Sequence, residues 1–149
     1  QIYISHSASN PDSHDKELLI YGYSYELRQI LINMINNSKD SILLKRQHCK
    51  IKTKETDKIF LTITVDNKYM RIKIKDNSIG IREEIKDRIF EPYFKDDLYS
   101  SKPGLGLYIS KMIIENYMDG RLFLEDGEEG AVFVIELERN NNNTDKTVN

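Results

Sequence analysis

The sequence has no tryptophan and only one cysteine among its 149 residues. Cys49 alone excludes an internal disulfide and a cysteine-rich zinc site, and so little cysteine is typical of a reducing compartment. No stretch approaches the roughly 18 consecutive apolar residues of a membrane helix, and the N-terminus lacks the basic and apolar regions of a signal peptide. We therefore expect a soluble cytoplasmic domain, whether or not its parent protein is anchored in a membrane.

A strong charge of either sign is also missing, because 22 basic and 24 acidic residues give a net charge of −2. This balance offers no overall electrostatic case for a nucleic-acid partner. A local basic run is interpreted as a solvated loop, and it contains Lys45, Arg46, Lys50, Lys52, Lys54 and Lys58. With 39% hydrophobic residues, the composition predicts one folded domain over residues 1–139, and the polar tail 140–149 is expected to be disordered.

Hydrophobic periodicity predicts two amphipathic helices that pack side by side. The first covers Glu26–Ser41, with Ser24 as its expected N-cap, and carries apolar residues at spacings of three and four. Asn33, Asn37 and Asp40 fall together on the edge of its apolar stripe. This row is either the polar flank of a half-buried helix or one wall of a ligand pocket. The second helix is predicted over residues 106–118.

The rest of the pattern predicts strands and one short charged helix. The expected strands are Ile2–Ile4, Phe60–Val65, Met70–Ile74, Arg121–Glu125 and Ala131–Glu138. The second and third of them alternate in period two around residues 66–68, which favours a hairpin with one buried face. Arg82–Phe90 is predicted to be a short helix that ends before Pro92.

Candidate chemistry lies at the joints between these elements. Asp76 follows an alternating strand directly and precedes a turn that contains Gly80. Its carboxylate, held at the end of the strand, can accept a hydrogen bond from an amino group. The alternative is that this turn is merely structural. Gly104 and Gly106 precede the second helix, where backbone N–H groups and the helix N-terminus favour phosphate; the alternative is a tight loop. Phe90–Phe94 is an apolar segment that core packing alone would explain.

In combination, these segments resemble the N, G1, F and G2 boxes of the ATP-binding catalytic domain of bacterial sensor histidine kinases, in the GHKL superfamily. The matching residues are Asn33-x-x-x-Asn37, Asp76-x-x-x-Gly80, Phe90-Glu91-Pro92-Tyr93-Phe94 and Gly104-Leu105-Gly106-Leu107. The resemblance covers roughly Glu17–Glu138. It implies the Bergerat ATP-binding fold, an α/β two-layer sandwich whose mixed, largely antiparallel sheet is covered on one face by helices.

The resemblance also implies ATP and Mg²⁺ as cofactors and gives roles to single residues. Asn37 matches the magnesium ligand, Asp76 the residue that recognises adenine, and Lys95 a cation beside the γ-phosphoryl group. Lys102 has the same role or is a solvated loop lysine. The expected nucleotide-binding set is Asn33, Asn37, Asp40, Asp76, Gly80, Lys95, Lys102, Gly104, Leu105, Gly106 and Leu107.

Asn33 stands where related ATPases carry a glutamate that activates water, and an amide cannot accept that proton. The resemblance therefore implies slow hydrolysis and favours transfer of the γ-phosphoryl group to a histidine. The family's acceptor lies on an upstream dimerisation hairpin, and only 25 residues precede Glu26, so we expect the acceptor outside this chain rather than at His6, His14 or His48. A downstream response regulator, a homodimeric parent and a monomeric catalytic domain are implied as well.

Two departures from the family pattern lead to alternatives. Ser78 replaces a glycine of the G1 box, where a positive φ would strain its backbone, and Lys102-Pro103 shortens the lid. A degenerate module that binds nucleotide without catalysis is therefore the second hypothesis, and a free-standing GHKL-type ATPase is the third.

Overall fold

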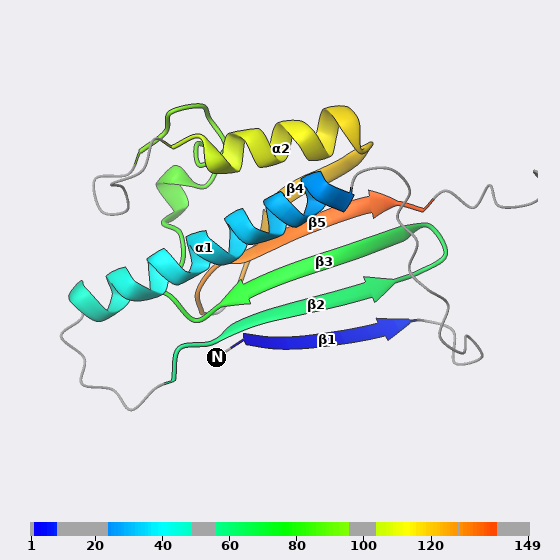
Figure 1. The fold of residues 1–149 in the computed structure, drawn as a ribbon. Coiled ribbons are helices and arrows are strands. Elements are labelled where there is room, and N and C mark those ends of the chain that lie inside the picture. The colour runs from blue at the N-terminus through cyan, green and yellow to red at the C-terminus, as the bar shows by residue number, and fades with distance from the viewer. Residues whose placement is uncertain (1, 9–23, 49–55, 96–103, 128, 140–149) are drawn as a thin grey trace, which may run out of the picture.

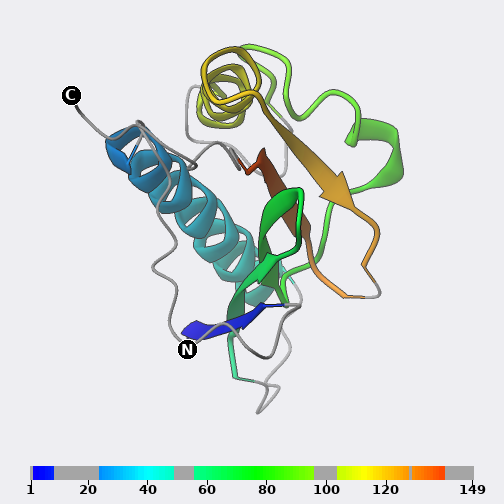
Figure 2. The ribbon, with the colours of Figure 1, turned by 90° about the vertical axis from the view of Figure 1, so that its right-hand side faces the viewer.

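The computed structural model describes residues 2–8, 24–48, 56–95, 104–127 and 129–139. Its elements are β1 (Ile2–Ala8), α1 (Ser24–His48), β2 (Ile59–Val65), β3 (Tyr69–Asp76), the 3₁₀ turn η1 (Glu83–Ile85), α2 (Gly106–Tyr117), β4 (Gly120–Glu125) and β5 (Val132–Glu138). One sheet forms the first layer, and both α-helices lie across the same face of it (Figures 1 and 2). The predicted two-layer sandwich is confirmed.

The sheet has the strand order β1-β2-β3-β5-β4. β1 pairs with β2 in parallel, and the other three neighbouring pairs are antiparallel, so the sheet is mixed and largely antiparallel as expected. Ile72 at the centre of β3 pairs with Ile63 on one side and Ile135 on the other. This register aligns the apolar residues of three strands on the face that the helices cover.

The alternation of β3 explains where Asp76 points. Met70, Ile72, Ile74 and Asp76 are all buried, whereas the residues between them are exposed or half-buried. Successive side chains of a strand point to opposite faces, so Asp76 shares its face with three core residues. The strand therefore carries a carboxylate into the layer between the sheet and the helices.

The first helix is longer than predicted at both ends, because α1 begins at Ser24 rather than Glu26 and continues past Ser41 to His48. Its sheet-facing stripe extends through Ser38, which is 1% exposed, to the buried Ile42. Because this residue is polar, the apolar spacing is interrupted there, and the periodicity predicted too short a helix. Lys45 and Arg46 consequently lie on the helix, and their assignment to a solvated loop was wrong.

The predicted helix over Arg82–Phe90 is also wrong, since the structure has only the 3₁₀ turn η1 followed by further turns. No residue of η1 is fully buried. Ile89 is buried, and Ile85 and Phe90 are half-buried against the core. A helix this short is marginal on its own, so tertiary contacts decide the backbone conformation instead. The hairpin, the second helix and the last two strands are confirmed within about two residues of their predicted ends.

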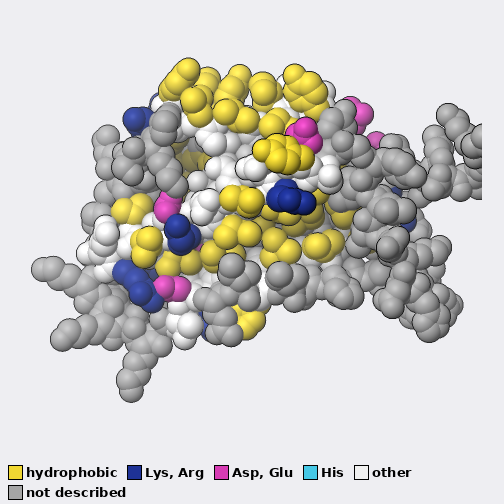
Figure 3. Space-filling model, in the orientation of Figure 1, with side chains coloured by type: hydrophobic (Ala, Val, Ile, Leu, Met, Phe, Trp, Pro, Cys, Tyr) yellow, Lys and Arg dark blue, Asp and Glu magenta, His cyan; other side chains and the backbone are white. Residues whose placement is uncertain are grey.

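The outer side of α2 exposes two large apolar residues. Ile109 is 42% exposed and Tyr117 is 58% exposed, and apolar side chains form a row over this helix in Figure 3. None of the described helices is long and apolar enough to cross a membrane. Several predictions fall outside the described residues, namely those for Cys49, Lys50, Lys52, Lys54, Lys102, Pro103, His14 and the tail 140–149.

The turn between β2 and β3 yields a pH-dependent prediction. Backbone N–H groups of Tyr69 and Lys68 donate to Asp66, as does Arg71, and these hydrogen bonds lower the pKa of Asp66 from 3.8 to about 2. The pKa is lower in the folded state, so ionised Asp66 stabilises the fold above about pH 4, and this contribution is lost as the pH falls towards 2. Asp66→Ala should lower the Tm at pH 6 and have a smaller effect at pH 2.5. A Tm difference that stays constant between these pH values would contradict this assignment.

Candidate functional site

The carboxylate of Asp76 is held firmly by one oxygen and leaves the other oxygen unused. Oδ1 accepts the backbone N–H groups of Ser78 at 3.0 Å and Ala131 at 3.1 Å. The residue is only 1% exposed, and its Oδ2 is buried without a hydrogen-bond partner among the described residues. Leaving a buried acceptor unpaired costs about 1–3 kcal/mol. The carboxylate therefore keeps one buried acceptor that no described group satisfies.

A second buried oxygen lies in the same layer. Ser38 Oγ, on the sheet-facing stripe of α1 between Met34 and Ile42, also lacks a hydrogen-bond partner among the described residues. The sequence analysis missed Ser38, although a serine at a spacing of four between two apolar stripe residues was the available signal. Two unpaired buried oxygens make the interface between α1 and the sheet more polar than a simple core.

The strain predicted at Ser78 is not found, because Ser78 is not among the residues with positive φ. It is buried, its N–H donates to Asp76, and its Oγ accepts the N–H of Gly80 at 3.2 Å. Gly80 takes the positive φ instead, at 74°. The hydroxyl thus builds a turn that glycine would leave open, and the serine stabilises the position of Asp76.

Gly130 closes the other side of this turn, and the sequence analysis did not single it out. Its φ is 70°, and a Cβ there would lie 1.9 Å from the carbonyl oxygen of Asp76. Only glycine allows the β4–β5 loop to approach so closely. The turn-rich sequence of residues 126–130 was a signal for a loop, but the contact with Asp76 is a property of the folded sheet.

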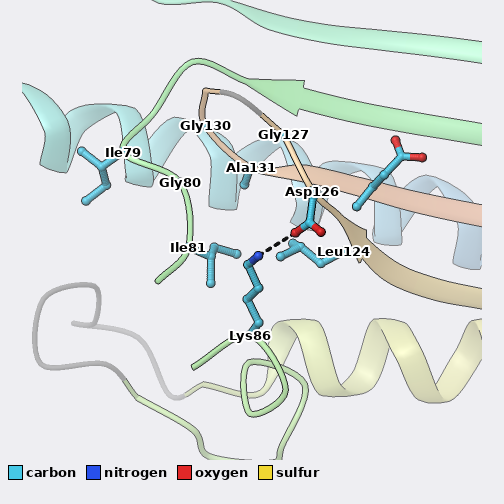
Figure 4. Close-up of a pocket in the computed structure, with 10 residues that line it drawn as sticks. Ile79, Gly80, Ile81, Lys86, Leu124, Asp126, Gly127, Gly130 and Ala131 are labelled. Atoms are coloured by element: carbon cyan, nitrogen blue, oxygen red, sulfur yellow. Dashed lines mark hydrogen bonds and ion pairs between the residues drawn. The ribbon is translucent and has the colours of Figure 1, made fainter. Parts of the chain in front are cut away.

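Outside this turn lies a hollow of about 160 Å³, shown in Figure 4. Lys86 crosses it to Asp126 at 2.6 Å and also pairs with Glu83. Hydrogen bonds to Asp126 and Glu83 raise the pKa of Lys86 above its ordinary value, so the amine stays charged. Asp76 is not among the residues that line the hollow, so the hollow is separate from the unpaired Asp76 oxygen. The Lys86–Asp126 ion pair joins the segment after Gly80 to the β4–β5 loop.

Asn33 joins the two helices. Its Nδ2 donates to the buried Ser110 Oγ at 3.0 Å, and its side chain lies directly over Gly106, where a Cβ would meet Asn33 Oδ1 at 2.5 Å. The structure therefore brings together two residues predicted for the site, Asn33 and Gly106. Ser110 was missed, because a serine inside a predicted helix gives no signal of its partner.

The N-terminus of α2 has no side-chain cap from its own N-cap residue. The helix begins at Gly106, and Leu105 at its N-cap makes no side-chain hydrogen bond. The N–H groups of a first helical turn and the helix dipole favour negative charge at such an end. Gly104, at φ 70°, approaches the Phe94 carbonyl so closely that a Cβ would lie 2.2 Å from its oxygen, which fixes the entry of the chain into the helix.

The aromatic residues of the segment Phe90–Phe94 differ in burial. Phe90 packs edge-to-face on Phe133 with ring centroids 6.4 Å apart, and Phe94 also contacts the core, which confirms core packing for these two residues. Tyr93 differs, since it is 70% exposed and has a φ of 60°. A bulky residue in this conformation is strained, and such strain is concentrated at functional sites.

The remaining predicted residues are placed as follows. Asn37 and Asp40 are half-buried on α1, Leu105 and Leu107 are half-buried around the start of α2, and Lys95 is exposed after the aromatic segment. The described residues contain no group of three or more His, Cys, Asp or Glu side chains that could hold a metal ion.

Comparison with known proteins decides the family. The family model for histidine kinase-, DNA gyrase B- and HSP90-like ATPases matches residues 22–141. The chain belongs to this family. It is 30% identical over 115 residues to the sensor protein TdiS of Thauera aromatica, covering 75% of this chain and 19% of TdiS. It is 28% identical over 123 residues to sporulation kinase B of Bacillus subtilis, covering 83% of this chain and 26% of that protein. The chain thus spans about a fifth of the first relative and about a quarter of the second.

Solved structures agree with the sequence relatives. The nucleotide-free catalytic domain of histidine kinase ThkA matches with a TM-score of 0.68 and 27% identity, over 92% of this chain and 80% of that one. Full-length ShkA in complex with AMPPNP matches with a TM-score of 0.62 and 27% identity, over 91% of this chain and 25% of that one. The chain is an ATP-binding catalytic domain of the histidine kinase type, as its four boxes suggested.

The contact between Asn33 and Gly106 makes a testable prediction. Gly106→Ala should force the Asn33 amide away from Ser110 and lower the free energy of unfolding by about 1 kcal/mol. In an Asn33→Ala background the same change should be neutral or should stabilise the helix by up to about 1 kcal/mol. Urea unfolding of the four proteins measures this coupling, and additive effects would show that the contact does not matter.

Proposed function

We propose that this chain binds MgATP and transfers its γ-phosphoryl group to a histidine on a separate dimerisation hairpin of the parent kinase. The observation that carries the proposal is the buried, unpaired Oδ2 of Asp76. The exocyclic amine of adenine is a donor, whereas guanine presents a carbonyl at the same position, so a fixed carboxylate oxygen selects adenine. The family membership of the chain supports the same ligand.

The triphosphate would lie between α1 and the N-terminus of α2. Uncapped N–H groups at Leu105 and Gly106 suit phosphate oxygens. Asn37, half-buried on α1, offers an amide oxygen of the kind that Mg²⁺ takes as a ligand. Since the described residues hold no acidic metal cluster, the phosphates would supply further ligands. Lys95 is exposed and directly follows Phe90–Phe94, where it would neutralise charge on the γ-phosphoryl group.

The side chain of Asn33 supports transfer rather than hydrolysis. Its amide donates to Ser110, and an amide oxygen is far too weak a base to remove a proton from water. A histidine acceptor already presents a neutral nitrogen lone pair, so the domain needs to supply positioning and charge stabilisation instead. The apolar outer face of α2, with Ile109 and Tyr117 exposed, is suited to docking the hairpin.

Further features of the parent protein are part of this proposal. We place the folded domain at residues 1–139, in the cytoplasm, as a monomeric unit of a homodimeric kinase. ThkA has been solved in complex with the response regulator protein TrrA, at 26% identity and a TM-score of 0.64 to this chain. By this likeness the phosphoryl group would pass from the hairpin to a response regulator.

Substitution of Asp76 tests the adenine assignment. Asp76→Asn can present an NH₂ group where Oδ2 was, so ATP should bind about tenfold or more weakly while GTP binds no worse than before. Isothermal titration with both nucleotides measures the change in selectivity. Unchanged ATP affinity with a folded variant would reject the assignment.

Asn37 tests the magnesium assignment separately. Asn37→Ala should weaken ATP binding about tenfold in the presence of Mg²⁺ and have little effect in EDTA, because only the metal-dependent part is lost. Asn116→Ala, on the exposed side of α2, is the matched control. An equal loss with and without the metal would assign Asn37 to another role.

Labelled phosphate distinguishes the kinase from its two alternatives. With [γ-³²P]ATP and the dimerisation hairpin of a related sensor kinase, we expect acid-labile label on the hairpin and little free phosphate. Rapid phosphate release without any hairpin would favour an ATPase. Absence of ATP binding at millimolar concentration would favour a degenerate module and overturn the proposal.

A further inference from the structure

We propose that Asn77 is a positioning residue for adenine recognition, which acts by extending the β2–β3 ladder one pair beyond Asp76. The inference rests on the proposed ATP binding and goes further, because no box of the sequence singled out Asn77. It is half-buried and directly follows Asp76, the last residue of β3. The end of a strand is where pairing frays most easily, and the unused oxygen of Asp76 lies at that end.

All four polar groups of Asn77 are engaged in the structure. Its N–H donates to the Lys58 carbonyl at 3.3 Å, and its Oδ1 accepts the Lys58 N–H at 2.8 Å. Its Nδ2 donates to the Thr56 carbonyl at 3.1 Å. Its carbonyl accepts Lys45 Nζ at 2.7 Å. Asn77 is therefore held at every polar group, by the segment before β2 and by α1.

The bonds to Lys58 have the form of one more antiparallel pair. The last regular pair between the strands is Ile59 with Asp76. One step further, Asn77 donates its N–H to Lys58, but the chain turns away, and the side-chain oxygen accepts the N–H that a backbone carbonyl would otherwise take. Asp76 is thereby enclosed between two paired positions, so its carboxylate is held on the core side of the sheet.

Lys45 extends this arrangement to the helix. It comes from α1, which also carries Asn37 and Ser38, and its bond to the Asn77 carbonyl joins that helix to the end of β3. The two walls between which adenine would lie are thus connected at one point. Asn77 itself acts through Asp76 and is not a catalytic residue.

Asn77→Ala tests the inference on the intact chain, with ATP, GTP and inorganic tripolyphosphate as separate probes. The variant should bind ATP about tenfold more weakly and should discriminate less between ATP and GTP, while tripolyphosphate, which has no base, should bind as to the wild type. Asn77→Asp retains the acceptor for Lys58 and should recover part of the ATP affinity. Asn116→Ala is the matched control and should match the wild type with every probe.

A purely structural role would lower stability but leave the ATP-to-GTP ratio of the folded fraction unchanged, and this outcome would overturn the inference. So would an equal loss of tripolyphosphate binding. If Asn77→Ala does not fold, Lys45→Met serves instead, because methionine keeps the length of the side chain. We expect the same selective loss of ATP affinity in smaller degree. Wild-type ATP affinity in Lys45→Met would overturn the inference. Wild-type protein that binds no ATP would instead defeat the proposed function.

Discussion

The structure depends on a carboxylate that is fixed by one oxygen and unsatisfied at the other. Asp76 is carried into the buried layer by the alternation of β3 and held by the backbone of Ser78 and Ala131. Two glycines make this possible, because Gly80 adopts a positive φ and Gly130 approaches the Asp76 backbone where no side chain fits. An unpaired buried acceptor costs stability in the unliganded domain, and under the proposed function the adenine amine would recover it.

The second constraint is the joint between the helices. Asn33 occupies the space over Gly106 and bonds Ser110, so the N-terminus of α2 is placed by a side chain of α1. The same residue lacks the basicity needed to activate water. One amide therefore holds the start of α2, where the phosphates are proposed to lie, and under the proposed function it would also make hydrolysis slow.

Sequence patterns predicted the parts of the fold that repeat a simple period. The β2–β3 hairpin, α2 and the last two strands follow from apolar spacing, and four short boxes identified the family. Periodicity failed where a polar residue is buried within an apolar stripe, as at Ser38, and where charged residues form turns, as over Arg82–Phe90. The roles of Asn77 and Gly130 depend on contacts between distant segments, so a single sequence did not reveal them.

The most direct test of this account is the contribution of the adenine amine to binding. Calorimetry would compare ATP with purine riboside triphosphate, which lacks only that amine, on the wild type and on Asp76→Ala. We expect the analogue to bind the wild type at least about tenfold more weakly than ATP does, and the two nucleotides to bind Asp76→Ala alike. Equal affinity of both nucleotides for the wild type would contradict the claim that the unpaired Asp76 oxygen recognises adenine.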